Sequence, residues 1–124
     1  MPVVHCAIGE GVRAGDAIQI HVTGRLDDVL YLFVEAAWGQ PVEAGPGFHA
    51  SAPCGFGWNA HVMALRDDDR FEVGPVSVRV EDLRARASLA QPLRDVRLHL
   101  QAPDAMALVH IPRVRSMRPR LKAG

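Results

Sequence analysis

The sequence predicts an all-β fold, and three observations support that prediction. Several segments alternate apolar and polar residues with a period of two, which is the pattern of a half-buried strand. Asp, Gly and Pro residues, which favour turns, separate these segments. The same succession of glycine, strand, turn and second strand occurs twice in the 124 residues, which indicates an internal repeat. We therefore expect one protein built from two similar halves.

The first half contains a predicted hairpin. Residues 16–24 alternate three aliphatic side chains with more polar ones, which predicts a strand with one buried face. Asp27 and Asp28 then offer a turn, because Asp tolerates turn geometry and bonds its own backbone. Residues 29–34 read V-L-Y-L-F-V, a continuous apolar run that predicts a strand buried on both faces.

The middle of the chain is rich in Gly and Pro, over residues 39–57, so regular structure there is expected to be short. Residues 45–59 are interpreted as a linker. Phe48, Phe56 and Trp58 are unusual in a free linker. We expect these aromatic side chains to pack on the sheet as a plug between the halves. The alternative is an exposed aromatic recognition surface.

The second half repeats the plan. Its predicted strands cover residues 62–65, 75–82, 96–101 and 105–111, the last of them stopped by Pro112. The acidic run Asp67 to Asp69 predicts a polar turn. Residues 82–93 are expected to be irregular, with one or two helical turns as the alternative.

This ordered succession, seen twice, resembles the bacterial carbon storage regulator family. The first half matches the family pattern without a gap at Val3, Val4, Gly9, Glu10, Gly15, Asp16, Ile18, Ile20, Val22, Gly24, Val34 and Ala36. The second half matches best over residues 96–103, followed by Val109 and His110 after one apparent insertion. The two matches cover most of the chain outside residues 45–59 and the C-terminal tail.

The resemblance implies a fold of two interleaved five-stranded units that form an intramolecular pseudo-dimer. The first strand of one unit would lie beside the last strand of the other. The expected division is residues 1–44 and 62–112 for the two regulator-like halves, 45–61 for the linker and 113–124 for a basic tail. A monomer is expected in solution, because each half would cover the strand edges of the other.

The resemblance also implies a non-enzymatic, post-transcriptional regulator that binds GGA-type RNA loops through the strand-edge face. The candidate RNA-binding residues are Arg66, His110, Arg113 and Arg115. The chain departs from the family where Cys6 and Ala7 replace an arginine pair, and where Glu43 stands in the last strand of the first half. Since carboxylates repel phosphate, one RNA site is expected rather than two, on the face that includes Arg113 and Arg115.

Structural roles compete with these assignments. Arg66 would simply pair with the acidic run at residues 67–69, and His110 would be a structural histidine in an apolar strand. On that interpretation the fold has lost RNA binding and serves as a protein-interaction module, for example toward a regulatory protein. No nucleophile motif or glycine-rich phosphate loop suggests an enzyme.

Charge is unevenly distributed along the chain. All 14 acidic residues lie between Glu10 and Asp104, whereas five of the 14 basic residues follow Pro112. The basic tail either contacts an anionic partner or folds back on the acidic body. The two cysteines and six histidines match no zinc spacing, so neither metal nor cofactor is expected. The absence of an apolar span and of a signal peptide pattern predicts a cytoplasmic protein without membrane contact.

Overall fold

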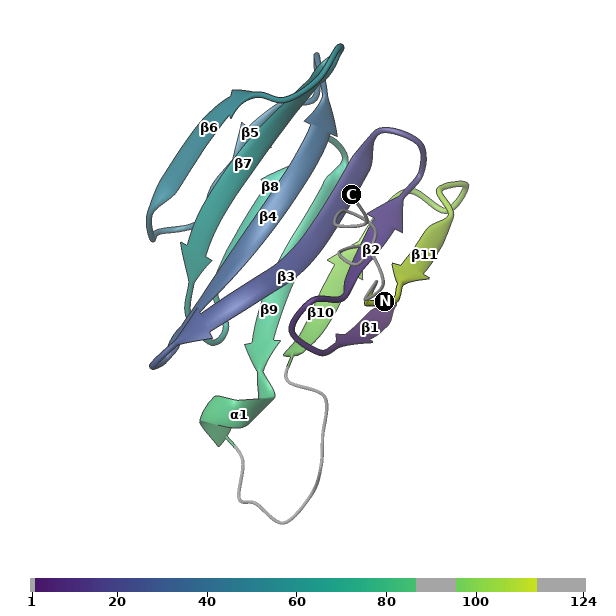
Figure 1. Ribbon diagram of the computed structural model, residues 1–124. Coiled ribbons are helices and arrows are strands. Elements are labelled where there is room, and N and C mark those ends of the chain that lie inside the picture. Colours follow the sequence, from purple (N-terminus) through teal and green to yellow (C-terminus); the bar gives the residue numbers. More distant parts are fainter. Residues whose placement is uncertain (1, 87–95, 114–124) are drawn as a thin grey trace, which may run out of the picture.

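The computed structural model describes residues 2–86 and 96–113. Within these residues the chain forms eleven strands in two antiparallel sheets that pack face to face (Figure 1). The expectation of an all-β fold is confirmed.

Sheet A has five strands. In spatial order they are β1 (Val3–Cys6), β10 (Val96–Gln101), β9 (Val76–Asp82), β8 (Arg70–Val73) and β5 (Val42–Glu43). Sheet B has six strands. In spatial order they are β11 (Leu108–Ile111), β2 (Gly11–Ala14), β3 (Ile18–Leu26), β4 (Val29–Ala37), β7 (Trp58–Leu65) and β6 (His49–Pro53). One helical turn, α1 (Leu83–Arg86), follows β9.

The strand order crosses between distant parts of the chain. In sheet A the consecutive strands β8, β9 and β10 are flanked by β1 and β5, which come from the first 43 residues. In sheet B the consecutive strands β2, β3 and β4 are flanked by β11 and β7, which come from later in the chain. Each sheet is therefore completed by strands that come from the opposite part of the chain.

The core fills the space between the sheets, because every second residue of each central strand points inward. In β9 the buried residues are Val76, Val78 and Val80, and in β10 they are Val96, Leu98 and Leu100. β3 and β4 contribute the same alternation from the opposite sheet. Removing one such side chain costs about 2–5 kcal/mol for Leu→Ala.

A buried ion pair joins the two sheets at one end of the sandwich. Arg25 of β3 donates to both carboxylate oxygens of Asp82, the last residue of β9. The Asp82 side chain is fully buried, and that of Arg25 is 15% exposed. Asp82 also accepts a hydrogen bond from the backbone N–H of Arg84 at 3.1 Å, so it caps α1.

Most predicted elements occur where the sequence placed them. Residues 96–101 match β10, residues 75–82 contain β9, and the predicted turns contain Asp27 and Asp68 with positive φ angles of 57° and 75°. The helical alternative for residues 82–93 occurs as the single turn α1, and the rest of that segment lies outside the described residues.

Two expectations are wrong in detail. The segment 45–59 contains β6 and the start of β7, which pair as a hairpin across the Gly55–Gly57 loop, so much of it is regular. The apolar run at residues 29–34 is buried on one face only, because Val29, Tyr31 and Phe33 point to the outer face of sheet B and are half-buried. Aromatic and branched side chains suit such a half-covered strand.

Candidate nucleic-acid interface

The edge strands β1 and β11 lie side by side at one side of the sandwich (Figure 1). In the described part of the chain, β1 is the last strand of sheet A and β11 is the last strand of sheet B. An open groove of about 340 Å³ lies between them. Its lining residues are Val3, Val4, His5, Leu108 and His110.

Register explains why these side chains meet. His110 lies opposite Val12 of β2, and Leu108 lies opposite Ala14. Val12 and Ala14 are fully buried, so their partners on β11 face the same, inner side. His110 is therefore directed toward the groove, where His5 of β1 lines the other wall.

Glu10 anchors the turn at one end of the groove. Its Oε1 accepts a hydrogen bond from the backbone N–H of Ala7 at 3.0 Å and lies 3.2 Å from Nε2 of His110. The Glu10 side chain is only 13% exposed. The Glu10 carboxylate therefore lies beside His110 at this end of the groove.

Arg113 packs over the same turn. Its guanidinium donates to the backbone carbonyl of Ile8. Gly9, with a φ of +97°, leaves room for the arginine, since a Cβ there would lie 2.9 Å from Nε of Arg113. A carbonyl does not neutralise a guanidinium, so this contact holds Arg113 beside the groove with its full charge. Arg115 lies outside the described residues.

Arg66 lies far from this groove. It follows β7, which is separated from β11 by β2, β3 and β4, or about 19 Å at the usual strand spacing. Its Nη1 lies 2.6 Å from Oδ2 of Asp28, and its backbone N–H donates to Asp69. The expectation of an ion pair with residues 67–69 is therefore wrong in the partner, because the side chain reaches across to the β3–β4 turn.

The edge of β7 differs from that of β1. β6 pairs with β7 over five residues, so the outer edge of β7 is covered, whereas the corresponding edge of β1 is open. The backbone N–H and C=O groups of β7 are therefore used on both sides. Sequence reasoning missed β6 because its residues, H-A-S-A-P, are small and uniformly exposed and give no alternating pattern.

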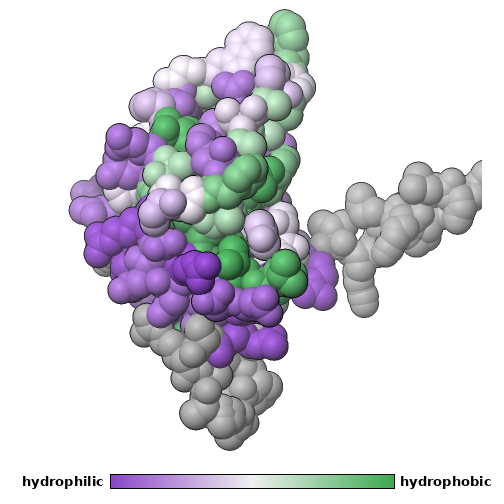
Figure 2. All heavy atoms as spheres, turned by 90° about the vertical axis from the view of Figure 1, so that its left-hand side faces the viewer, coloured by the Kyte–Doolittle hydropathy of each residue, from purple (hydrophilic) through white to green (hydrophobic). Residues whose placement is uncertain are grey.

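Two of the three aromatic side chains of the middle segment do not pack as a plug, whereas Trp58 is half-buried. Phe48 is 62% exposed and Phe56 is 96% exposed. Phe56 instead contacts the exposed ring of Trp38, with 6.1 Å between ring centroids. Figure 2 views the β6 side of the molecule and shows apolar residues at the upper tip, where the β6–β7 loop lies.

Two histidines meet across the β6–β7 hairpin. Nε2 of His49 lies 3.1 Å from Nδ1 of His61, and the ring centroids are 5.3 Å apart. The centroid distance equals the nitrogen separation plus about two ring radii, so the rings meet edge to edge through a hydrogen bond. Burial, and secondly the charge of His49, lower the pKa of His61 below its ordinary value.

Other reactive side chains are few in the described residues. Cys6 is buried, and the Cys54 thiol lies 3.9 Å from Glu35. Burial and the Glu35 carboxylate raise the pKa of Cys54. Residues 2–86 and 96–113 contain no group of three metal-ligating side chains.

Comparison with protein-family models, curated proteins and solved structures finds no match to this chain. In the part of the chain that the structure describes, no helix is long and apolar enough to cross a membrane.

Proposed function

We propose that the chain consists of two tandem units resembling the carbon storage regulator, which exchange their first and last strands and bind RNA. The strand count supports this division, because five strands precede β6 and five follow it. The sheet order supports the exchange, because β1 and β5 complete the sheet of the second unit while β7 and β11 complete that of the first.

The RNA site of this proposal is the β1–β11 groove. The observation that carries it is that two open strand edges from opposite ends of the chain meet there, beside His5, His110 and Arg113. Unpaired backbone groups of an edge strand are able to hydrogen-bond to the edges of unstacked bases, which is how single-stranded RNA loops are read. Arg113 supplies a charge for phosphate.

A single RNA site follows from the asymmetry between the two edges. The corresponding edge of β7 is paired with β6, and its neighbouring arginine, Arg66, is bound to Asp28. The β7 edge and the arginine on that side are therefore already engaged.

The test is a fluorescence anisotropy titration of the full chain with a short hairpin that presents a GGA loop. A hairpin of the same length with a scrambled loop is the control. Binding of the GGA hairpin with a steep salt dependence is expected, and equal binding of both hairpins would contradict recognition of base edges.

A second candidate function is supported by the exposed aromatic tip. Trp38 and Phe56, whose rings contact each other at the β6–β7 loop, are each more than half exposed, which is unusual for large apolar side chains and typical of protein contact sites. In this alternative the chain binds a regulatory protein, such as a single-unit regulator. Calorimetric titration of the unmodified protein and the Phe56→Ser variant with that regulator separates the RNA-binding and protein-binding proposals. If the variant loses the heat of binding to the regulator but keeps its RNA affinity, the protein-binding role is supported.

A further inference from the structure

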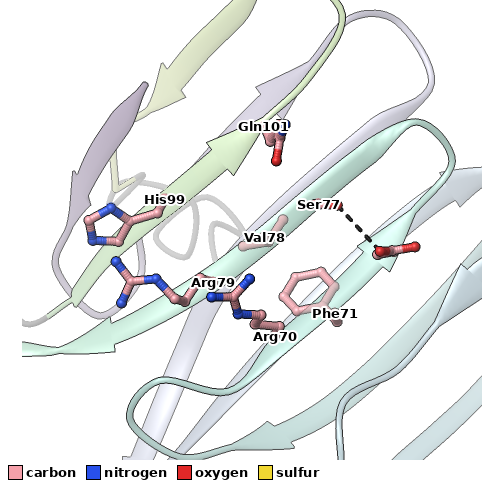
Figure 3. Close-up of a pocket in the computed structure, with 8 residues that line it drawn as sticks. Arg70, Phe71, Ser77, Val78, Arg79, His99 and Gln101 are labelled. Carbon is pink, nitrogen blue, oxygen red and sulfur yellow. Dashed lines mark hydrogen bonds between the residues drawn. The ribbon is translucent and has the colours of Figure 1, made fainter. Parts of the chain in front are cut away.

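The outer face of sheet A carries three basic side chains in one row across adjacent strands. Arg70 of β8 lies directly opposite Arg79 of β9, and Arg79 lies directly opposite His99 of β10. Their sequence neighbours Phe71 and Val78 are buried in the core, so the row faces outward. Figure 3 shows the two guanidinium groups and the histidine ring together on one side of a pocket of about 320 Å³.

The charge of this row is incompletely balanced by the protein. Like charges directly opposite one another on neighbouring strands destabilise a sheet. Arg79 is offset by Asp68 at 2.8 Å, and Nε2 of His99 lies 2.8 Å from Glu81. Arg70 is exposed and has no ion-pair partner among the residues that the structure describes. A guanidinium placed in this way is a ready ligand for an oxyanion.

A second row lines the other side of the pocket and is not basic. Glu72, Ser77 and Gln101 are direct cross-strand neighbours, and all three border the pocket. The Ser77 hydroxyl donates to Glu72 at 3.4 Å, as the dashed line in Figure 3 marks. A carboxylate and an amide suit a ligand with hydroxyl groups, because Glu72 accepts hydrogen bonds and Gln101 both donates and accepts them.

The two rows define the chemistry of the ligand. Residues two apart along a strand are separated by about 7 Å, which is the reach from the phosphate of a pentose phosphate to its distal hydroxyls. A bare anion would use the arginine row and gain nothing from Glu72, whereas a neutral sugar would leave the arginines without a partner.

We infer that this pocket binds a phosphomonoester of a hydroxyl-bearing small molecule, of the sugar phosphate class. Arg70 and Arg79 hold the phosphate, and Glu72, Ser77 and Gln101 hold the hydroxyl groups. The pocket lies on the outer face of sheet A and shares no lining residue with the β1–β11 groove.

The test is a two-dimensional amide NMR titration of the full chain with ribose 5-phosphate, inorganic phosphate and ribose at matched ionic strength. Ribose 5-phosphate should shift the amides of β8, β9 and β10 and bind more tightly than inorganic phosphate, and ribose should shift none of them. Arg70→Gln should weaken binding about tenfold, because it removes a charge-assisted fork. The matched control is Arg13→Gln, which removes an exposed strand arginine from sheet B and should leave the affinity unchanged.

A structural role for Arg70 predicts different results. If Arg70 stabilised the fold, Arg70→Gln would lower the thermal midpoint, whereas relief of the opposed arginine charges predicts an unchanged or raised midpoint. Arg70→Lys keeps the charge and should retain weakened binding even if the Gln variant does not fold. Shifts outside β8–β10, equal loss with Arg13→Gln, or equal affinity for phosphate and ribose 5-phosphate would overturn the assignment. A single-stranded RNA that shifts these amides when ribose 5-phosphate does not would also overturn it.

Discussion

Replacing the buried Asp82 by Ala should strongly destabilise the protein. The change removes a fully buried carboxylate that receives both arms of the Arg25 guanidinium, itself 15% exposed, and that caps α1 through Arg84. Breaking one side of a buried ion pair costs about 3–5 kcal/mol. Because Arg25 retains some solvent, we expect about 3 kcal/mol, or a fall in the thermal midpoint of roughly 10 °C for a chain of this size.

The matched control is Asp28→Ala. It removes the carboxylate of the Arg66–Asp28 pair, whose side chains are 63% and 64% exposed, and should cost less than about 1 kcal/mol. Urea unfolding of both variants measures the difference directly. In the double variant Arg25→Met with Asp82→Leu, the loss should be smaller than the sum of the single changes, because no charge is left buried. A loss for Asp82→Ala no larger than for Asp28→Ala would refute the argument that this pair joins the sheets.

The remaining predictions concern side chains near the β6–β7 hairpin. The pKa of His61 is lowered in the folded state, so the unfolded chain takes up more protons and the stability of the fold should decrease as the pH drops below about 6.5. His61→Gln should reduce this pH dependence of the unfolding free energy, measured by urea unfolding at several pH values. An unchanged pH dependence in the variant would contradict the role of His61. The raised pKa of Cys54 predicts that iodoacetamide alkylates this thiol slowly, and that alkylation is faster in the Glu35→Gln variant. Mass spectrometry measures both rates. Equal rates in the two proteins would exclude the Glu35 carboxylate as a cause of the raised pKa. Phe56→Ser should leave the unfolding free energy within about 0.5 kcal/mol, because the ring is 96% exposed; a larger loss in urea unfolding would show that the ring packs on the fold.

The sequence was sufficient to predict the strands whose pattern reflects one buried face. Alternation over residues 75–82 and 96–101 arises because each of these strands has one side in the core, and the structure contains both. It was insufficient for β6, which lies at an edge with all five residues exposed. A strand held only by backbone pairing to its neighbour leaves no hydrophobic period in the sequence.

The same distinction applies to the candidate site. The position of His110 opposite the inward-facing Val12 follows from strand alternation. The placement of the first strand beside the last one was expected from the resemblance, and β1 and β11 line one groove. The partner of Arg66 was not, because Asp28 is 38 residues away and approaches only through the pairing of β4 with β7. The exposure of Phe56 also depends on the loop shape set by Gly55 and Gly57, whose φ angles are 85° and 84°.

The row of Arg70, Arg79 and His99 shows how register creates a site that spacing along the chain conceals. These residues are separated by nine and by 20 positions, yet they become direct neighbours once β8, β9 and β10 pair. A basic row of this kind has no linear motif, so only the topology reveals it.

The most direct test of the central proposal compares arginine variants in the GGA-hairpin titration at two salt concentrations. Replacing Arg113 and Arg115 together by Ala should weaken binding and reduce the salt slope by about 1.5–2, since each lost phosphate contact removes about 0.7–1. Arg66→Ala should leave both quantities close to those of the unmodified protein, because Arg66 is already paired with Asp28. Equal losses in the two variants would contradict the single groove between β1 and β11, and absence of binding by the unmodified protein at low salt would refute RNA binding itself.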